Sequence, residues 1–175
     1  MSRPAPSSAA LPIAYAVLRI LIVANWLMVP VILVLLFVVP TERWVMSALD
    51  LSHSPEADRA VIGLRAIAAL GLVAIPVTYV VLKRLLAIVE TVREGDPFVA
   101  VNASRLQETA WALLALQLLS LVIGAIARNV SPPGHALDID AGFSISGWLA
   151  VLLTFLLARV FAHGTLMRQD LEGTV

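Results

Sequence analysis

The sequence contains no cysteine and only three histidines. Without thiols the chain cannot form disulfides, use a thiolate nucleophile or bind zinc through sulfur. Metal binding by other side chains is also disfavoured, because the remaining candidates fall in two loops without the spacing that metal ligands show, and we interpret them as ordinary loop polarity. These candidates are Asp50, His53, His135, Asp138 and Asp140. We therefore predict no metal and no cofactor.

Charged residues are scarce as well. They make up 14% of the 175 residues, and hydrophobic residues make up 60%, whereas globular domains are about 25% charged and about 45–50% apolar. A lipid bilayer must therefore be the solvent for much of the surface. The 12 basic and 12 acidic residues cancel, which leaves no global field to attract nucleic acid. Direct nucleic-acid binding is not expected.

Ionisable side chains are missing from the middle of the apolar segments. Asn25 and Gln117 are neutral there, and Arg65 and Arg159 lie close enough to segment ends to reach water. Buried ionisable groups usually mark ion or proton pathways, so their absence argues against a proton-coupled pump. The sequence also has no Asp pair, Ser-His pair or His-Glu zinc pattern. We predict that the protein is not an enzyme.

Four apolar segments of 16 to 20 residues dominate the chain. A helix rises about 1.5 Å per residue and must cross a hydrocarbon core of about 30 Å. The sequence therefore predicts an all-α integral membrane bundle of four transmembrane helices. It forms a single domain from residue 11 to residue 175, after a flexible tail at residues 1–10. The predicted spans are residues 20–39, 66–82, 110–127 and 143–158.

Helix start and stop signals predict that the second helix is much longer than its span. Ser54-Pro55-Glu56 combines a serine cap, a proline at the first helical position and an acid in the first turn. No stop signal follows before Gly95, so this helix should hold about 40 residues and reach about 60 Å. Pro30 and Pro76 interrupt two spans. We interpret them as tolerated kinks, with hinges as the alternative.

Basic residues determine the predicted orientation. Eight of the twelve fall on the side that holds both termini and the loop between the second and third spans, and four fall on the other side. Basic residues are retained in the cytoplasm, so both termini and this loop should be cytoplasmic. The eight are Arg3, Arg19, Lys83, Arg84, Arg93, Arg105, Arg159 and Arg168.

Small residues recur at four-residue spacing along the fourth predicted helix, and such ridges let membrane helices approach closely. We interpret the ridge as packing within the bundle, with a homodimer contact as the alternative. A weaker stripe in the second helix, from Ala57 to Ala69, would suit it as the facing helix. The ridge consists of Gly142, Ser146, Ala150, Thr154, Ala158 and Ala162.

Charges of both signs gather on the expected cytoplasmic side, in a set that we call the polar cap. Asp96 before Pro97 is typical of a helix cap, and Asn102 and Arg105 share one helical face. We also expect Arg159 to reach a carboxylate near the loop, such as Glu90, Glu94 or Asp96. The cap either satisfies itself or docks a soluble partner. Its residues are Asp96, Pro97, Asn102, Arg105, Arg159, Arg168 and Asp170.

Two motifs resemble the bacterial membrane proteins grouped as domain of unknown function 2975. The resemblance implies a four-span protein of the bacterial inner membrane. Members of that family often lie beside genes for small helix-turn-helix regulators, which implies a regulatory partner, and the family supplies no catalytic residues. The motifs are Gly95-Asp96-Pro97-Phe98-Val99 with Asn102 and Arg105-Leu106, and Ala158-Arg159-Val160-Phe161 with Gly164, Arg168 and the segment from Asp170 to Val175.

Our first functional hypothesis is a non-enzymatic regulatory or scaffolding protein whose polar cap docks a cytoplasmic protein. The alternative is a transport or channel component that acts as an oligomer, although polar residues that could line a path are sparse. An enzyme using Asp96 or His163 as acid or base ranks third, because no nucleophile, base and orienting group occur at a recognisable spacing.

The predicted orientation can be tested with a protease-sensitive tag fused after Val175. We expect protease added outside intact cells to leave this tag uncut, because the positive-inside distribution keeps the C-terminal end in the cytoplasm. The measurement is the fraction of tag cleaved before and after the cells are opened. Cleavage in intact cells would overturn the orientation.

Overall fold

The computed structural model describes residues 10–37, 55–130 and 141–172, and every regular element in these ranges is an α-helix. Each of the four helices is long and apolar enough to cross a membrane, which confirms the predicted all-α fold with four candidate membrane spans. The helices are α1 (Ala10–Phe37), α3 (Pro55–Arg93), α4 (Ala100–Val130) and α5 (Ile145–Glu172).

The bounds of α3 follow its sequence signals. The helix begins at Pro55 and ends at Arg93, a length of 39 residues, and Gly95 lies just beyond it with a φ of +91°. Only glycine adopts this left-handed conformation without steric cost, which is why it so often ends helices. The expected serine cap at Ser54 and residues 1–9 of the expected tail at residues 1–10 lie outside the described residues, whereas Ala10 already belongs to α1.

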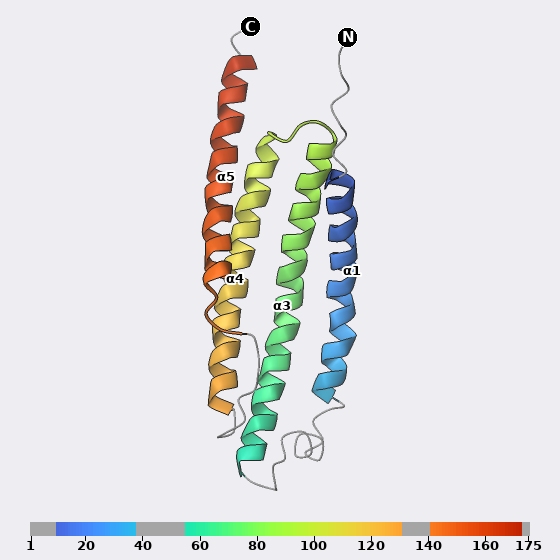
Figure 1. The fold of residues 1–175 in the computed structure, drawn as a ribbon, viewed down its shortest axis with the longest axis vertical. Coiled ribbons are helices and arrows are strands. Elements are labelled where there is room, and N and C mark those ends of the chain that lie inside the picture. Colours follow the sequence, from blue (N-terminus) through green and yellow to red (C-terminus); the bar gives the residue numbers. More distant parts are fainter. Residues whose placement is uncertain (1–9, 38–54, 131–140, 173–175) are drawn as a thin grey trace.

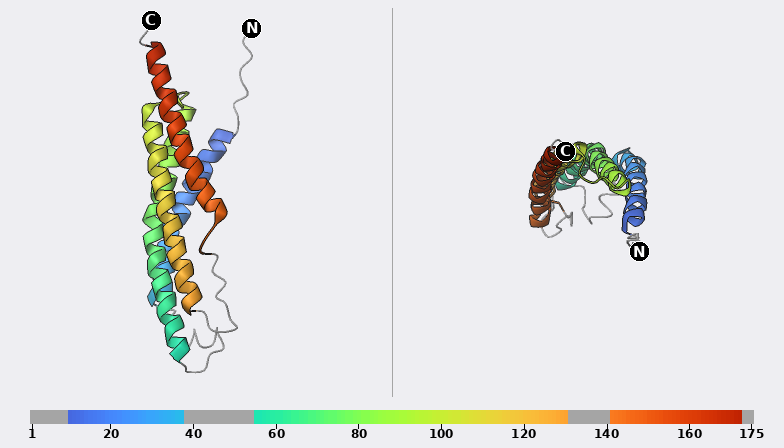
Figure 2. Two further views of the ribbon diagram at one scale, coloured as in Figure 1. Left: turned by 90° about the vertical axis from the view of Figure 1, so that its left-hand side faces the viewer. Right: turned by 90° about the horizontal axis from the view of Figure 1, so that it is seen from above.

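The helices form an open, curved row in the order α1, α3, α4, α5. In the part of the chain that the structure describes, contacts between helices occur only for α1 with α3, α3 with α4 and α4 with α5. Neighbouring helices run antiparallel, so the start of α1, the α3–α4 connection and the end of α5 share one end of the molecule (Figure 1). Seen from above, α1 and α5 occupy opposite ends of an arc (Figure 2).

A single row of helices buries few side chains. None of the residues of α1 is buried, and the buried apolar residues of the other helices include many alanines, such as Ala60, Ala110, Ala127 and Ala158. Small side chains let helix backbones approach closely, and in lipid this close packing replaces the hydrophobic drive that operates in water. The large apolar side chains therefore point outward, as expected for a surface that lipid covers.

Helix α1 is attached to α3 by polar and aromatic contacts. The Asn25 amide donates a hydrogen bond of 3.1 Å to the carbonyl oxygen of Ile75, and the rings of Trp26 and Tyr79 meet edge to face at 5.5 Å. Asn25 is the only polar side chain of the first predicted span. Its amide group is therefore engaged with the neighbouring helix.

The residues of the small-residue ridge differ in how deeply they are buried. Ala158 is buried, Thr154 and Ala162 are half-buried, and Ser146 and Ala150 are exposed. Because a helix turns about 100° per residue, four residues advance about 40° beyond one full turn, and a four-residue ridge winds around the helix. Within α5, only the C-terminal part of the ridge therefore packs on a neighbour. Gly142, the first residue of the ridge, precedes α5.

The expectation that the second helix faces the fourth is wrong. Helix α5 packs on α4, and the described parts of α3 and α5 do not touch. The reason is the row itself, in which α4 lies between them (Figure 2). The small residues of α3 serve the contact with α4 instead: a side-chain Cβ placed at Gly63 would lie 2.5 Å from a methyl carbon of Val130.

The segment before α5 lies directly against α4. The Ser120 hydroxyl accepts a hydrogen bond of 3.1 Å from the Gly142 amide and donates one of 3.3 Å to the Gly142 carbonyl. A Cβ at Gly124 would lie 2.7 Å from both the Ala141 carbonyl oxygen and Gly142 Cα. These are backbone atoms, which cannot rotate away as a side chain can. Gly124 is therefore required for this approach.

We expect Gly124→Ala to destabilise the protein by about 1–3 kcal/mol, the usual cost of overpacking. Gly164→Ala is the matched control, because its Cβ would meet Phe98 at an ordinary 3.5 Å and the helix gains from alanine's higher propensity. The midpoint of unfolding by sodium dodecyl sulfate in mixed micelles measures the stability of both variants. Equal midpoints for the two variants would contradict the prediction.

Candidate functional site at the α3–α4 connection

The end of α3 forms a Schellman motif, which sets the direction of the connection. The Asp96 amide donates to the Thr91 carbonyl at 3.1 Å, and the Gly95 amide donates to the Val92 carbonyl at 3.2 Å. This pair of bonds satisfies carbonyls that the end of a helix would otherwise leave unpaired. The chain then turns sharply at Gly95 and starts back toward α4.

The connection remains non-helical through Val99, and α4 begins at Ala100. The expectation that Asp96 caps this helix with Pro97 at its first position is therefore wrong. In place of a first helical turn, the segment carries Phe98 to α5, where its ring stacks on that of Phe161 at 5.4 Å. Tertiary packing thus prevails over a local capping signal.

Asn102 lies at the centre of the site and is completely buried, with 0% of its surface exposed. Its amide nitrogen donates to the Thr91 hydroxyl at 2.7 Å and to the Pro97 carbonyl at 2.9 Å. Its carbonyl oxygen accepts a hydrogen bond of 3.0 Å from Arg105. One side chain therefore joins the end of α3, the connection and the start of α4.

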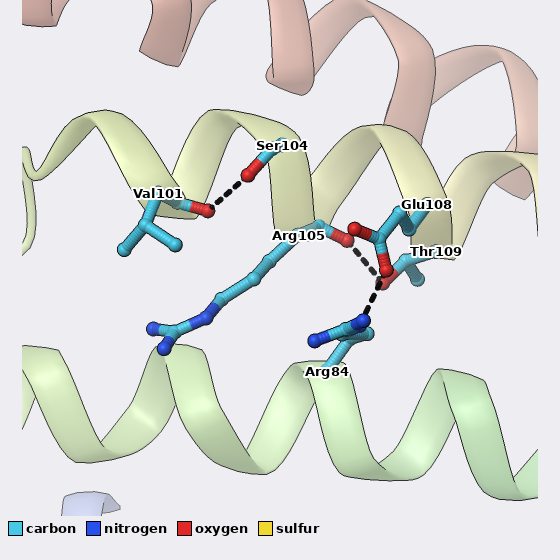
Figure 3. Close-up of polar contacts among 6 residues, drawn as sticks. All are labelled: Arg84, Val101, Ser104, Arg105, Glu108 and Thr109. Atoms are coloured by element: carbon cyan, nitrogen blue, oxygen red, sulfur yellow. Dashed lines mark hydrogen bonds and ion pairs between the residues drawn. The ribbon is translucent and has the colours of Figure 1, made fainter.

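Arg105 extends the same network along α3. Its Nη1 also donates to the Ala87 carbonyl at 3.0 Å, while its buried Nε has no hydrogen-bond partner. The sequence-based prediction that Asn102 and Arg105 share one helical face is confirmed by their mutual hydrogen bond. Figure 3 shows the Arg105 side chain reaching from α4 across to α3. A cation near the end of a helix also stabilises the partial negative charge of the helix dipole.

An ion pair reinforces the same helix contact at its edge. Arg84 of α3 and Glu108 of α4 approach to 2.5 Å (Figure 3), and their side chains are 40% and 46% exposed. Exposed pairs contribute little stability, typically about 0–1 kcal/mol. The pair's main effect here is to hold the only carboxylate of α4 toward α3.

The two motifs of the sequence meet in space at Phe98. Besides stacking on Phe161, the Phe98 ring lies over Gly164, where a Cβ would be 3.5 Å away. This is an ordinary van der Waals distance, so the ring packs closely on this part of α5. The connection and the C-terminal part of α5 therefore form one packed unit, which includes the buried Thr165.

The structure brings together only some residues of the predicted polar cap. Asn102 is buried, Arg105 is half-buried, and Asp96 and Pro97 are half-buried in the connection. In this conformation Asn102 cannot contact a partner protein. The side chains of Arg168 and Asp170 lie outside the described residues, although α5 continues through both positions.

The expectation that Arg159 reaches Glu90 or Glu94 is wrong, whereas its approach to Asp96, the third carboxylate expected for it, stays a prediction. Arg159 lies beside α4 in a groove with Ser104 and Gln107. The cause is again the order of the row, because the carboxylates belong to α3 and α4 separates α3 from α5.

Sequence analysis missed Thr91 and Thr109. Thr91 accepts the Asn102 hydrogen bond, and Thr109, 1% exposed, donates to the Arg105 carbonyl at 2.8 Å. Thr109 follows Asn102 and Arg105 at seven and four residues, which places all three on one face of α4. That spacing was the available signal. Thr91 gives no such signal, because its partner Asn102 is eleven residues away and belongs to the next helix.

In the described ranges no three His, Asp or Glu residues gather to hold a metal ion. The outer-loop candidates Asp50, His53, His135, Asp138 and Asp140 lie outside those ranges. A scan against protein-family models and searches of curated proteins and of solved structures give no match for this chain. Its function must therefore be inferred from its own residues.

We expect Asn102→Ala to loosen the connection, because it removes three hydrogen bonds and leaves buried polar groups unpaired, at a cost of about 1–3 kcal/mol. Hydrogen exchange of the amides of residues 91–99 measures this as faster exchange, about tenfold for each 1.4 kcal/mol. Ser104→Ala is the control, because its exposed hydroxyl only bonds the nearby Val101 carbonyl. Unchanged protection in Asn102→Ala would refute the role of Asn102.

Proposed function

We propose that the protein is a non-enzymatic regulatory or scaffolding protein of a bacterial inner membrane. Both termini and the α3–α4 connection lie in the cytoplasm, and the end of the molecule that carries them docks a soluble protein. The resemblance to the family of domain of unknown function 2975 favours a small helix-turn-helix regulator as that partner. The excess of basic residues at this end supports the orientation.

The observation that carries the proposal is the projection of α5. Arg159 is the first charged residue after the apolar segment, yet the helix continues to Glu172, a further distance of about 20 Å at 1.5 Å per residue. Figure 1 shows this part of α5 extending beyond the start of α4. A helix that leaves the bilayer in this way presents a surface to the cytoplasm.

In the proposed arrangement this projecting helix carries exposed apolar side chains beyond the level of Arg159. Leu166 and Met167 are 58% and 63% exposed, and they share a helical face with His163 at three- and four-residue spacing. Apolar groups that are exposed together to water are typical of protein-binding surfaces. Amphipathic helices often bind partners through such anchors. We call His163, Leu166 and Met167 the docking face.

Contacts with the α3–α4 connection hold the part of α5 next to the docking face. The Phe98–Phe161 stack holds the connection against α5, and the buried Asn102 network holds the connection against α3. Helix α5 packs on α4 and on no other described helix, and the Phe98–Phe161 stack couples any shift of α5 on α4 to the connection. Such a shift, driven from the outer loops or the lipid, would expose or hide the docking face.

A transport component is the second candidate, and the open row is the observation that favours it. Four helices in an arc enclose no passage by themselves, so a path would require further copies of the chain. The mid-span Asn25 is engaged with α3, which leaves little polar lining. Flux into proteoliposomes above the empty-vesicle background would support this candidate.

We expect Leu166→Lys to reduce the recovery of specific partner proteins in mild detergent at least fivefold, because it places a charge at the centre of the docking face. Ile62→Lys is the matched control, since Ile62 is similarly exposed, at 66%, and lies near the start of α3, at the other end of the molecule. Quantitative mass spectrometry of co-purified proteins compares the two. If both variants recover the same proteins as the unaltered chain, the docking proposal fails.

A further inference from the structure

A groove of about 200 Å³ lies between α4 and α5, at the end of the molecule that carries the α3–α4 connection. Its lining combines polar and apolar side chains from both helices, and no part of the network around Asn102 lines it. Its lining includes Ser104 and Gln107 of α4 and Phe155, Ala158, Arg159 and Ala162 of α5.

Arg159 makes this groove positive. The carboxylate nearest along α4, Glu108, is held by Arg84 toward α3, and the acids Glu90 and Glu94 belong to α3, beyond α4. No Asp or Glu lines the groove, and neither Glu108 nor the acids of α3 are placed to balance the exposed guanidinium. Gln107 is exposed and can add the donors of its amide group. This arrangement favours an anion.

The groove also lies at the depth of lipid headgroups. The α5 segment from Ile145 to Ala158 carries no charge, and Arg159 follows it directly. Immediately below, the rings of Trp111 and Phe155 meet edge to face at 5.3 Å, and aromatic residues gather at this level of a bilayer. Next to them the apolar surface of α5 continues with Leu152 and Leu156, both exposed, where an acyl chain can lie.

We propose that this groove binds the headgroup of an anionic phospholipid. The Arg159 guanidinium pairs with the phosphate, Gln107 donates to the phosphate or the glycerol oxygens, and Phe155, Ala158 and Ala162 contact the start of an acyl chain. An anionic lipid fits better than a zwitterionic one, because the groove offers no carboxylate to pair with a headgroup ammonium. A soluble anion would lack the apolar contacts and would meet only one cation.

This site is separate from the docking face, which begins one helical turn farther from the membrane, and it does not depend on a protein partner. A lipid held between α4 and α5 would also fix their relative position. Lipid composition could thereby influence how the projecting part of α5 is presented.

Native mass spectrometry of the full chain in an uncharged detergent tests the proposal. With phosphatidylglycerol and phosphatidylcholine added in equal amounts, we expect the unaltered chain to retain phosphatidylglycerol preferentially. Arg159→Gln should lower this retention on the order of five- to tenfold, the effect of losing one charge-assisted phosphate contact. Arg128→Gln, which removes an exposed arginine at the other end of α4, should leave it unchanged. Equal losses in the two variants would overturn the proposal.

A second variant tests the groove while keeping the charge. Ala162→Leu fills the space beside Arg159, and we expect it to lower phosphatidylglycerol retention as well; unchanged retention would overturn the placement of the lipid. Glycerol phosphate at millimolar concentration should not displace the lipid. Displacement would show that the site takes a soluble anion and would overturn the assignment to phospholipid. Circular dichroism confirms that each variant is folded.

Discussion

Asn102 donates from one amide nitrogen to the Thr91 hydroxyl and the Pro97 carbonyl, and its oxygen accepts from Arg105. Such a fully buried side chain is stable only when its polar atoms are paired. The end of α3, the connection and the first turn of α4 must therefore keep one relative arrangement. The positions of Phe98, and through it of α5, depend on that arrangement.

The row of helices follows from how helices associate in lipid. Water does not drive apolar surfaces together there, so a helix needs only as many neighbours as its close contacts and hydrogen bonds supply. Helix α4 has two such faces, with Asn102, Arg105 and Thr109 toward α3 and Ser104 and Gln107 toward α5. Helix α1 contacts only α3 among the described helices, through Asn25, the ring of Trp26 and the ring of Tyr15, over which Arg93 lies. The arc is therefore open on its remaining sides.

The C-terminal half of α5 combines three roles within a few turns. Phe161 receives the connection, Arg159 borders the groove against α4, and Leu166 and Met167 are exposed where the helix projects. Phe161 lies on the opposite side of the helix from Arg159, whereas Leu166 lies on nearly the same side as Arg159 but two turns farther along the axis. The three roles therefore occupy separate positions on the helix. A movement of α5 on α4 would change the groove and the projecting surface together, which would couple lipid and protein partner.

The sequence by itself determined the number of helices, the ends of α3 and the shared face of Asn102 and Arg105. These features depend on local composition and on the helical period, which a single segment contains in full. Only the tertiary structure decided which helices are neighbours, that Asn102 is buried, and that Arg159 faces α4 instead of Glu90 and Glu94. A helix that is apolar on most sides does not specify its neighbour by hydrophobicity. In lipid the choice depends on close packing at Gly124 and on a few hydrogen bonds, whose partners lie far apart in the chain.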